Sequence, residues 1–304
     1  MKKIDIHVHT IAERGLLRSR GDTFATPEEL FEMYDMLGVE KAVLLPIVSP
    51  EGQTDTNTNR EIMGIAQRYP DRFYWFCNID PRQDINDTAT DFAAMLRYYR
   101  DCGARGLGEI TANLPMDDPR VEALLAGCEE TGMPVTIHIG DLGGDYGLVD
   151  SLGLPKLEAL LQKFPKLILL GHSQKFWSEI GSDVTQETRG GNPKGPVAPG
   201  GRIPELMRRY PNLCGDLSAG SGCNAMMRDP EFGYAFLEEF QDRLFYGTDI
   251  CSPWDISHIR VKMGPFLEEG VAQGKLSPQA CEKICWGNAL RLLEGRWEIG
   301  EVTV

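Results

Sequence analysis

Eight short apolar segments, alternating with segments of helical period, constrain the fold of this chain more than any other feature. The apolar segments are rich in β-branched and aromatic residues, which favour strands. They are IDIHVH (4–9), KAVLLPI (41–47), FYWFCNI (73–79), ARGLGEI (104–110), PVTIHI (134–139), LILLGH (167–172), NLCGDLS (212–218) and LFYGTD (244–249). Strands and helices that alternate eight times in 304 residues predict an α/β fold, the (β/α)8 TIM barrel.

The segments between the predicted strands carry the start and stop signals of helices. Several of them begin with proline and end at glycine. We expect helices at 27–38, 90–103, 119–132, 154–164, 230–240 and 277–293. A doubly wound open sheet is the alternative, but such a sheet usually has a glycine-rich phosphate loop after its first strand, and this chain has none. No change of composition marks a second domain, so we expect one domain over 1–304.

One segment does not fit the alternation. Residues 181–201, GSDVTQETRGGNPKGPVAPGG, are too rich in glycine and proline for a helix. They follow the sixth predicted strand, on the side where TIM barrels keep their active-site loops. Either a lid or a tolerated surface loop explains the segment.

Composition narrows the classes of partner. The chain has 31 basic and 45 acidic residues, and its net charge of −14 excludes a general affinity for nucleic acid or an anionic membrane. Its apolar runs are shorter than the roughly 20 residues that span a bilayer, and the N-terminus shows no signal-peptide pattern. The eight cysteines form no CxxC motif, so we expect reduced thiols in a cytoplasmic protein. A small molecule is the expected substrate.

Histidine and carboxylate side chains gather at the ends of predicted strands. In a TIM barrel the carboxyl ends of the strands converge on one mouth. Imidazole and carboxylate are ligands of first-row metals, with zinc the default for imidazole-rich sites. We therefore predict a divalent metal site formed by four of the five histidines and two acidic residues: His7, His9, Glu109, His138, His172 and Asp249.

Each of these residues also has a structural alternative. A buried histidine is commonly a hydrogen-bonded core residue, Asp249 could cap a following helix, and Glu109 could cap or pair. We interpret the fifth histidine, His258, as structural. Strict alternation along the first strand would place Asp5 on the same face as His7 and His9, where it could pair with Arg105 in the barrel floor.

The pattern of strand ends resembles the amidohydrolase superfamily. The shared features are HxH on the first strand, single histidines on strands five and six, and aspartate on strand eight. Segments similar to its amidohydrolase-2 branch extend over nearly the whole chain: YPDRFYWFCNIDP, CGARGLGEI, YPNLCGDLS, YGTDICSPW and WGNALRLL. The resemblance implies a metal-dependent TIM-barrel enzyme. The branch also contains decarboxylases and hydratases of aromatic-derived acids.

The resemblance implies roles for individual residues. His7, His9 and Asp249 would hold the more buried metal. His138 and His172 would hold a second metal or, in mononuclear members, supply one ligand and one catalytic imidazole. Many members bridge two metals with a carboxylated lysine on strand four, where this chain has Glu109 instead. Glutamate bridges metals in some related hydrolases, so the resemblance implies one or two ions, of zinc or else of manganese or iron.

Three functions agree with these residues. The favoured one is hydrolysis of an amide, lactone or ester by metal-activated water, with Asp249 transferring protons and His172 stabilising the oxyanion if it is not a ligand. The second is non-oxidative decarboxylation or hydration, in which His172 or Asp249 protonates carbon. The third is a metal-stabilised binding barrel without catalytic activity.

The sequence offers few indications of the substrate. The loop after the first strand contains Arg14, Arg18 and Arg20, and arginine suits bidentate binding of a carboxylate. Trp177 and Trp254 follow the sixth and eighth strands, where they could flank an aromatic or apolar substrate. Surface exposure of the arginines and packing of the tryptophans are the alternatives. The sequence does not fix the oligomeric state, but barrels of this family often pair, so a homodimer is one option.

Overall fold

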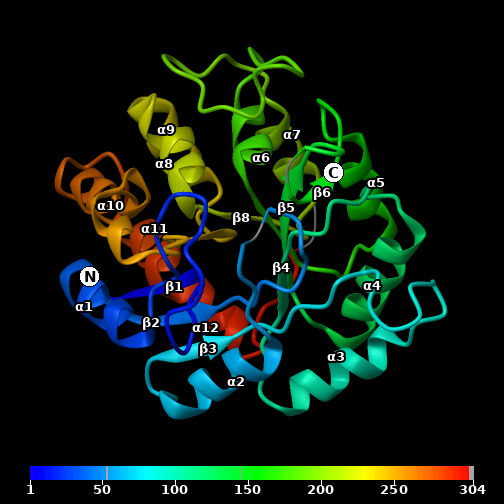
Figure 1. The fold of residues 1–304 in the computed structure, drawn as a ribbon. Coiled ribbons are helices and arrows are strands. Elements are labelled where there is room, and N and C mark those ends of the chain that lie inside the picture. The colour runs from blue at the N-terminus through cyan, green and yellow to red at the C-terminus, as the bar shows by residue number, and fades with distance from the viewer. Residues whose placement is uncertain (53, 145, 301–304) are drawn as a thin grey trace.

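The computed structural model describes residues 1–52, 54–144 and 146–300 and has eight parallel strands around a common axis (Figure 1). Each of the eight predicted segments overlaps one barrel strand. The strands are β1 (Lys3–Val8), β2 (Val39–Leu44), β3 (Phe73–Trp75), β4 (Leu107–Ile110), β5 (Val135–Gly140), β7 (Leu169–His172), β8 (Leu213–Asp216) and β9 (Leu244–Phe245). A further short strand, β6 (Leu148–Val149), pairs with β5 alone.

Backbone pairing closes the barrel. The strands form two runs in the orders β1-β2-β3 and β4-β5-β7-β8-β9. A parallel bridge between Cys77 and Leu107 joins the end of the first run to β4. A bridge between Val8 and Ile250 joins the segment after β9 to β1. The structure therefore confirms the (β/α)8 barrel.

Helices cover the outside of the barrel. The six predicted helices are present as α1 (Pro27–Leu37), α3 (Phe92–Asp101), α4 (Pro119–Thr131), α5 (Pro155–Lys163), α9 (Pro230–Glu239) and the pair α11 (Pro278–Glu282) and α12 (Asn288–Leu293), which a π-helical turn separates. The helices that the sequence did not predict are α2 (Asn59–Arg68), α6 (Gln174–Trp177), α7 (Arg202–Arg209), α8 (Ala219–Met227) and α10 (Met263–Ala272). Every described helix is too short to span a lipid bilayer.

Two apolar clusters show which way the strand residues face. Ile4 and Ile6 pack inside the barrel with residues of β2, β7, β8, β9 and α12. Val8 instead belongs to the cluster between the strands and the outer helices. The pairing of β1 with β2 is irregular between Asp5 and Val8, so the predicted strict alternation is wrong across this stretch.

The same irregularity overturns the predicted pair of Asp5 and Arg105. Asp5 is fully buried and accepts hydrogen bonds from the hydroxyl of Tyr34 on α1 and from both the hydroxyl and backbone N–H of Thr248. Arg105 precedes β4 and is exposed. Asp5 therefore faces the helix layer, where it joins β1, α1 and the segment after β9.

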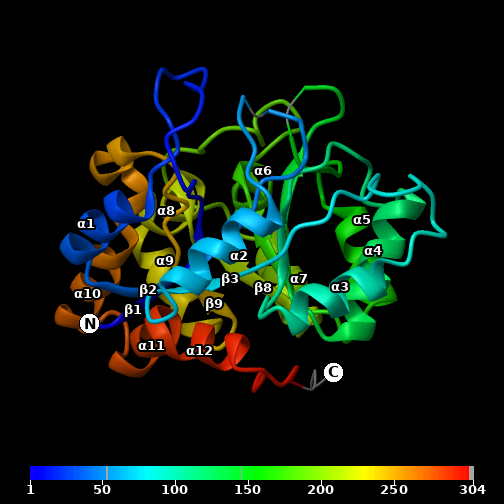
Figure 2. The same cartoon turned by 60° about the horizontal axis from the view of Figure 1, so that its bottom comes forward.

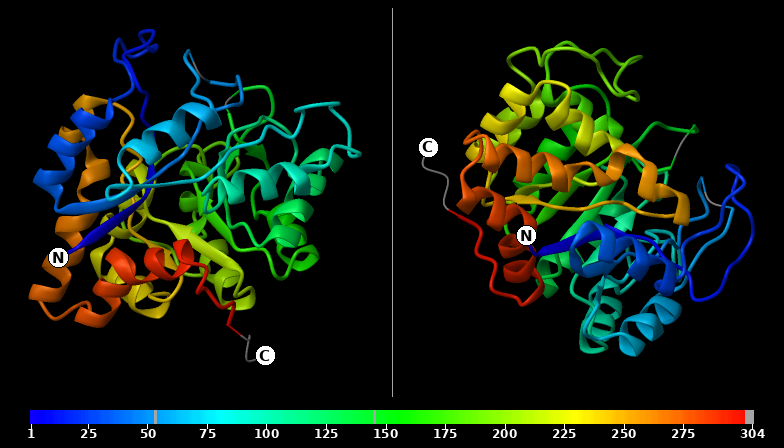
Figure 3. Two further views of the ribbon diagram at one scale, coloured as in Figure 1. Left: turned by 90° about the horizontal axis from the view of Figure 1, so that it is seen from below. Right: turned by 90° about the vertical axis from the view of Figure 1, so that its left-hand side faces the viewer.

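Loops and the C-terminal helices lie at opposite ends of the barrel. In Figure 2 the loops that follow β1, β2 and β5 project from one side, while α11, α12 and the chain's C-terminal segment lie on the other. The views from below and from the side in Figure 3 show the same separation. The first residues of β1 lie on the side of α11 and α12. The carboxyl ends of the strands therefore open toward the loops.

Candidate metal centre

Backbone irregularities in β1 and β4 aim the first side chains of the site. The irregular pairing of β1 with β2 lies between Asp5 and Val8, a stretch that contains His7 and directly precedes His9. The pairing of β4 with β5 is also irregular, between Leu107 and Ile110. Within that stretch Gly108 has φ of 135°, and Glu109 follows it as a buried carboxylate. Bulges of this kind re-aim side chains next to active sites.

Four donor groups from β1, β4 and the end of β9 meet at one point. The Nε2 atoms of His7 and His9 are 3.0 Å apart. Glu109 Oε2 lies 3.6 Å from each of these nitrogens. Asp249 Oδ1 lies 3.8 Å from His7 Nε2 and 3.6 Å from His9 Nε2.

These separations fit a single metal ion. Ligand bonds of about 2.0–2.2 Å in tetrahedral geometry place neighbouring donor atoms about 3.3–3.6 Å apart. The distances from the carboxylate oxygens to the imidazoles, 3.6–3.8 Å, lie at or just above that range, and the 3.0 Å between the two Nε2 atoms lies below it, so His7 and His9 would move slightly apart to share an ion. His7, His9 and Asp249 alone already bring three donor atoms within reach of one ion. Two imidazoles and two carboxylates are also a donor set that zinc, manganese and iron accept.

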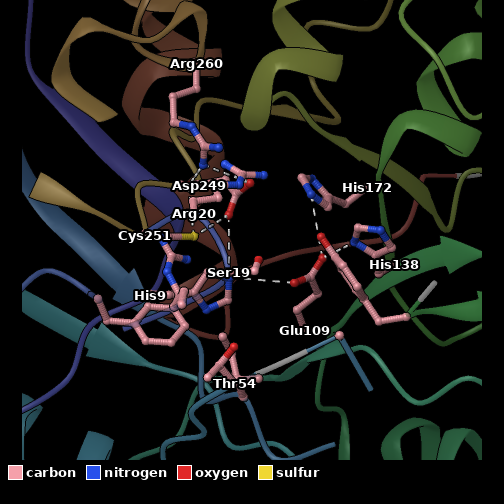
Figure 4. A pocket seen from close by; sticks show the side chains of 15 residues that line it. His9, Ser19, Arg20, Thr54, Glu109, His138, His172, Asp249, Cys251 and Arg260 are labelled. Atoms are coloured by element: carbon pink, nitrogen blue, oxygen red, sulfur yellow. Dashed lines mark hydrogen bonds and ion pairs between the residues drawn. The ribbon is translucent and has the colours of Figure 1, made fainter. Parts of the chain in front are cut away.

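Glu109 connects this group to the other two histidines. Its second oxygen, Oε1, lies 2.7 Å from His138 Nδ1 and 3.6 Å from His172 Nε2. Figure 4 shows the Glu109 side chain between His9 on one side and His138 and His172 on the other. The 2.7 Å contact is a hydrogen bond, so His138 would have to move slightly from Glu109 for both to bind one ion.

Hydrogen bonds on the far side of two imidazoles fix which nitrogen faces the metal position. His9 Nδ1 donates to the backbone oxygen of Leu45 at 2.9 Å. His7 Nδ1 donates to Asp216 Oδ2 at 2.6 Å. Metal-binding histidines usually make such a bond, because it leaves Nε2 unprotonated and orients the ring. Sequence reasoning missed Asp216, although its place at the end of the seventh predicted strand is the signal that marked His172 and Asp249.

The two acidic residues of the site are held ionised. Burial opposes ionisation of Glu109, but the His138 and His7 imidazoles outweigh it and hold its pKa well below the usual range. Burial also opposes ionisation of Asp249, yet Arg260 and His7 keep its pKa below the ordinary value. Metal ligands of this type must be deprotonated, so the electrostatics agree with the geometry.

A comparison of the sequence with protein families agrees with this site. The model of the family described as Amidohydrolase matches residues 4–295. The chain belongs to the amidohydrolase family. The family consists of metal-dependent enzymes, so the donor set is where this chain would carry its metal. No curated protein matches the sequence.

Solved structures of similar shape include enzymes of two reaction types. An uncharacterised TIM-barrel protein from Bordetella bronchiseptica is 21% identical, with a TM-score of 0.62, and the match covers 97% of this chain and 99% of that one. A probable 2-pyrone-4,6-dicarboxylic acid hydrolase from Acinetobacter baumannii, with citric acid bound, is 14% identical, with a TM-score of 0.56 and coverage of 97% and 100%. A 5-carboxyvanillate decarboxylase from Novosphingobium aromaticivorans, complexed with manganese and a nitrobenzoic acid, is 16% identical, with a TM-score of 0.55 and coverage of 87% and 79%. At these identities the likeness shows the fold alone.

A cavity of about 250 Å³ gives access to the amidohydrolase site. Its walls include Glu109, His138, His172 and Asp249, together with side chains from the loops around the mouth. Among the residues that the structure describes, none of those that line this cavity comes from 181–201.

The three arginines that the sequence singled out occupy different places. Arg14 is exposed, pairs with Glu29 and does not line the cavity. Arg18 lines it, but two hydrogen bonds from its guanidinium, of 3.0 and 2.6 Å, engage Asp22. Arg20 also lines the cavity and pairs with no carboxylate among the described residues.

Neither tryptophan lines the cavity. Trp177 is 1% exposed, packs in the core and donates its indole N–H to the backbone oxygen of Asp216 at 2.8 Å. Trp254 is 64% exposed on a 3-10 helix at Pro253–Ser257. His258, at the end of that helix, accepts from the N–H of Arg260 at 3.3 Å and lies outside the site, which agrees with a structural role.

The cavity also has walls that sequence reasoning did not indicate. Arg260 Nη1 lies 3.2 Å from Asp249 Oδ2 and also contacts the backbone oxygen of Asp249. The Tyr146 ring packs on the His138 imidazole, with centroids 4.4 Å apart. The Cys251 thiol lies 3.5 Å from Asp249 Oδ1. Tyr146 and Cys251 stand in irregular loops and Arg260 in a three-residue 3-10 helix, Ile259–Val261, all too short or irregular for a periodic pattern to mark an inward-facing side chain.

Proposed function

We propose that the chain is a metal-dependent hydrolase of a small amide, lactone or ester that bears a carboxylate. The contact of Glu109 with both histidine pairs carries this proposal. Its Oε2 faces His7 and His9, and its Oε1 faces His138 and His172. A carboxylate in this place can serve two metal positions at once, as glutamate bridges do in hydrolases. His7, His9, Glu109 and Asp249 would hold the first ion, and His138 and His172 a second.

In hydrolysis the ion would activate the water, and the side chains would move the proton. Bound by these residues, a divalent ion would supply a water molecule of lowered pKa, about 7, and a positive charge toward the carbonyl of the substrate. Asp249 accepts the proton of the attacking water and returns it to the leaving group, because its low pKa keeps it ionised beforehand. Arg260 holds this carboxylate in place through its Oδ2 atom.

Arg20 supports the assignment of an acidic substrate. It lines the cavity with no carboxylate partner in the described part of the chain, whereas Arg18 is satisfied by Asp22. A guanidinium in this state suits a carboxylate of the substrate, which it can bind through two parallel hydrogen bonds. Figure 4 places Arg20 on the Asp249 side of the cavity, away from His138 and His172.

A second candidate function is non-oxidative decarboxylation or hydration of a carboxylic acid. The orientation of His172 favours it, because Nδ1 faces Asp216 and Ser218 while Nε2 faces the cavity wall at Glu109. An imidazole with one nitrogen held by a carboxylate is suited to deliver a proton to carbon.

Metal content per chain distinguishes the two functions. We would measure it by elemental analysis in protein purified without chelator, for the unaltered chain, for Glu109→Ala and for His258→Ala as a control outside the site. Hydrolysis predicts two ions that fall to one or fewer in Glu109→Ala and stay at two in His258→Ala. One ion, unchanged in Glu109→Ala and accompanied by release of carbon dioxide from aromatic acids, would favour the second function. No metal after loading would contradict both.

A further inference from the structure

Asp216 is a buried carboxylate that the proposed reaction does not use. It ends β8 and is 0% exposed. We propose that Asp216 is a positioning residue that places the proton of both His7 and His172 on Nδ1, so that both Nε2 atoms face the cavity as free lone pairs. The expected effect of Asp216 on metal affinity rests on the proposed function. The positions of the two protons do not, because they can be measured in the metal-free protein.

One oxygen of Asp216 serves both imidazoles. Its Oδ2 lies 2.6 Å from His7 Nδ1 and 3.3 Å from His172 Nδ1. The two rings lie close together, with centroids 4.5 Å apart. A carboxylate oxygen can only accept, so His7 Nδ1, bonded to it at 2.6 Å, must carry a proton. We extend this to His172 Nδ1, which lies 3.3 Å from Oδ2 and 3.1 Å from the Ser218 hydroxyl, a group that can donate or accept. The opposite nitrogens then face Glu109, at 3.6 Å in both cases.

The carboxylate itself cannot rotate away from this position. Its other oxygen, Oδ1, accepts the backbone N–H of Ser218 at 2.9 Å. The backbone oxygen of Asp216 accepts the indole N–H of Trp177 at 2.8 Å. The Ser218 hydroxyl lies 3.1 Å from His172 Nδ1 and adds a second contact on that ring. The bonds to Oδ1 and to the backbone oxygen therefore keep Oδ2 directed toward the two rings.

Direct binding of a metal by Asp216 is the competing explanation, because His7, His172 and Asp216 also bring three donor atoms together. The side of the His7 ring on which Asp216 lies argues against it. His7 Nε2 faces His9 and Asp249, whereas Asp216 contacts the opposite nitrogen, Nδ1, at 2.6 Å, the length of a charge-assisted hydrogen bond. Asp216 thus orients ligands and is not one of them.

Asn in place of Asp216 cannot keep all of these bonds. If its amide oxygen takes the Oδ2 position, the NH2 group faces the N–H of Ser218, and two donors meet. If the NH2 group takes the Oδ2 position, it donates to Nδ1 and forces a proton onto Nε2 of at least one ring. The second arrangement blocks a nitrogen that faces the metal position.

Nitrogen NMR of 15N-labelled histidine tests this directly, and the chain has only five histidines to assign. Burial opposes the charge of His7, but Asp216 and Glu109 raise its pKa, so the tautomers are read at a pH high enough for both imidazoles to be neutral. Under that condition, in metal-free protein, we expect His7 and His172 as Nδ1–H tautomers. An Nε2–H tautomer at either residue would overturn the proposal, whether or not any variant folds.

Asp216→Asn provides the second test, with Asp150→Asn as the matched control. Asp150 is also a buried carboxylate, but it accepts only backbone N–H groups near the start of α5. We expect Asp216→Asn to shift His7 or His172 toward the Nε2–H tautomer and to weaken metal affinity about 10–100-fold in competition with a chelator. Asp150→Asn should change neither. Unchanged tautomers and affinity in folded Asp216→Asn would contradict the proposal. A failure of the unaltered chain to bind metal would instead contradict the proposed function and leave the tautomer measurement valid.

Discussion

Asp249 and Arg260 form an ion pair in the wall of the cavity, with 3.2 Å between Asp249 Oδ2 and Arg260 Nη1. Burial works against the charge of Asp249, and Arg260 is the largest of the neighbours that keep its pKa low. Activity that needs the ionised carboxylate is lost as the pH falls through this pKa. The acid limb of the pH profile should therefore lie below the range of an ordinary carboxyl group.

Arg260→Met should raise the pKa of Asp249, because burial then acts with less opposition. The acid limb of kcat/KM should move to higher pH by about one unit, the low end of the effect of a neighbouring cation. Arg18→Met removes another guanidinium of the cavity, but one that pairs with Asp22, and should leave the limb where it is. A limb that stays in place in Arg260→Met would show that another group controls it.

Arg20 should determine affinity for an acidic substrate. A hydrogen bond to a charged group contributes about 1.5–3 kcal/mol, so Arg20→Ala should raise KM by roughly 10–100-fold. The value of kcat should change little, because the bond exists in both the ground state and the transition state. Arg14→Ala is the control, since Arg14 pairs with Glu29 outside the cavity. Equal KM values for the two variants and the unaltered chain would remove Arg20 from substrate binding.

At the scale of one element, β4 depends on Gly108 to aim Glu109. Gly108 has φ of 135°, and a Cβ atom there would lie 2.6 Å from the backbone oxygen of Thr136. Gly108→Ala should lower the free energy of unfolding by about 3 kcal/mol, because it combines a backbone conformation open essentially to glycine with a clash against β5. It should also reduce metal affinity by moving Glu109. Chemical denaturation and chelator competition measure the two effects.

Gly64→Ala is the matched control for this substitution. Gly64 lies on the exposed side of α2, and a Cβ atom there meets nothing within 4 Å. Alanine at an open helical position should stabilise the chain by up to about 1 kcal/mol and leave metal affinity unchanged. A loss of stability as large in Gly64→Ala as in Gly108→Ala would show that the effect does not depend on the backbone conformation of Gly108 or on its contact with Thr136.

The same elements show where sequence reasoning about the strands succeeded and failed. The strand ends were predictable, because β-branched and aromatic runs stop at polar residues such as His172 and Asp249. The side of β1 to which each side chain points was not predictable. A period of two predicts strict alternation, whereas the pairing is irregular between Asp5 and Val8. Bulges leave no periodic trace, so Asp5 was expected in the barrel floor and instead faces α1.

At the scale of the whole molecule, the barrel was predictable because alternation repeats along the entire chain. That the candidate metal ligands lie close together followed from the rule that strand ends converge on one mouth. Cavity residues such as Arg260, in a short 3-10 helix, and Tyr146, in a loop, belong to connections whose paths depend on tertiary contacts, and no local sequence pattern encodes these paths. The distribution of Arg14, Arg18 and Arg20 among different environments was hidden for the same reason.

Metal binding should couple the site to the stability of the whole barrel. The candidate ligands come from both ends of the strand order, β1 and the segment after β9, so an ion held between them would join the first and last parts of the barrel. An ion that binds only the folded chain stabilises it by about 2.7 kcal/mol at a concentration 100 times Kd. Removal of metal with a chelator should therefore lower Tm by several degrees, and zinc or manganese should restore it.

His9→Ala should abolish the metal-dependent shift in calorimetry, because it removes one donor of the group. His258→Ala should retain the shift, because His258 lies outside the site. A Tm that is independent of metal in the unaltered chain, or a shift that His258→Ala abolishes as fully as His9→Ala does, would contradict the placement of the metal centre at the barrel mouth.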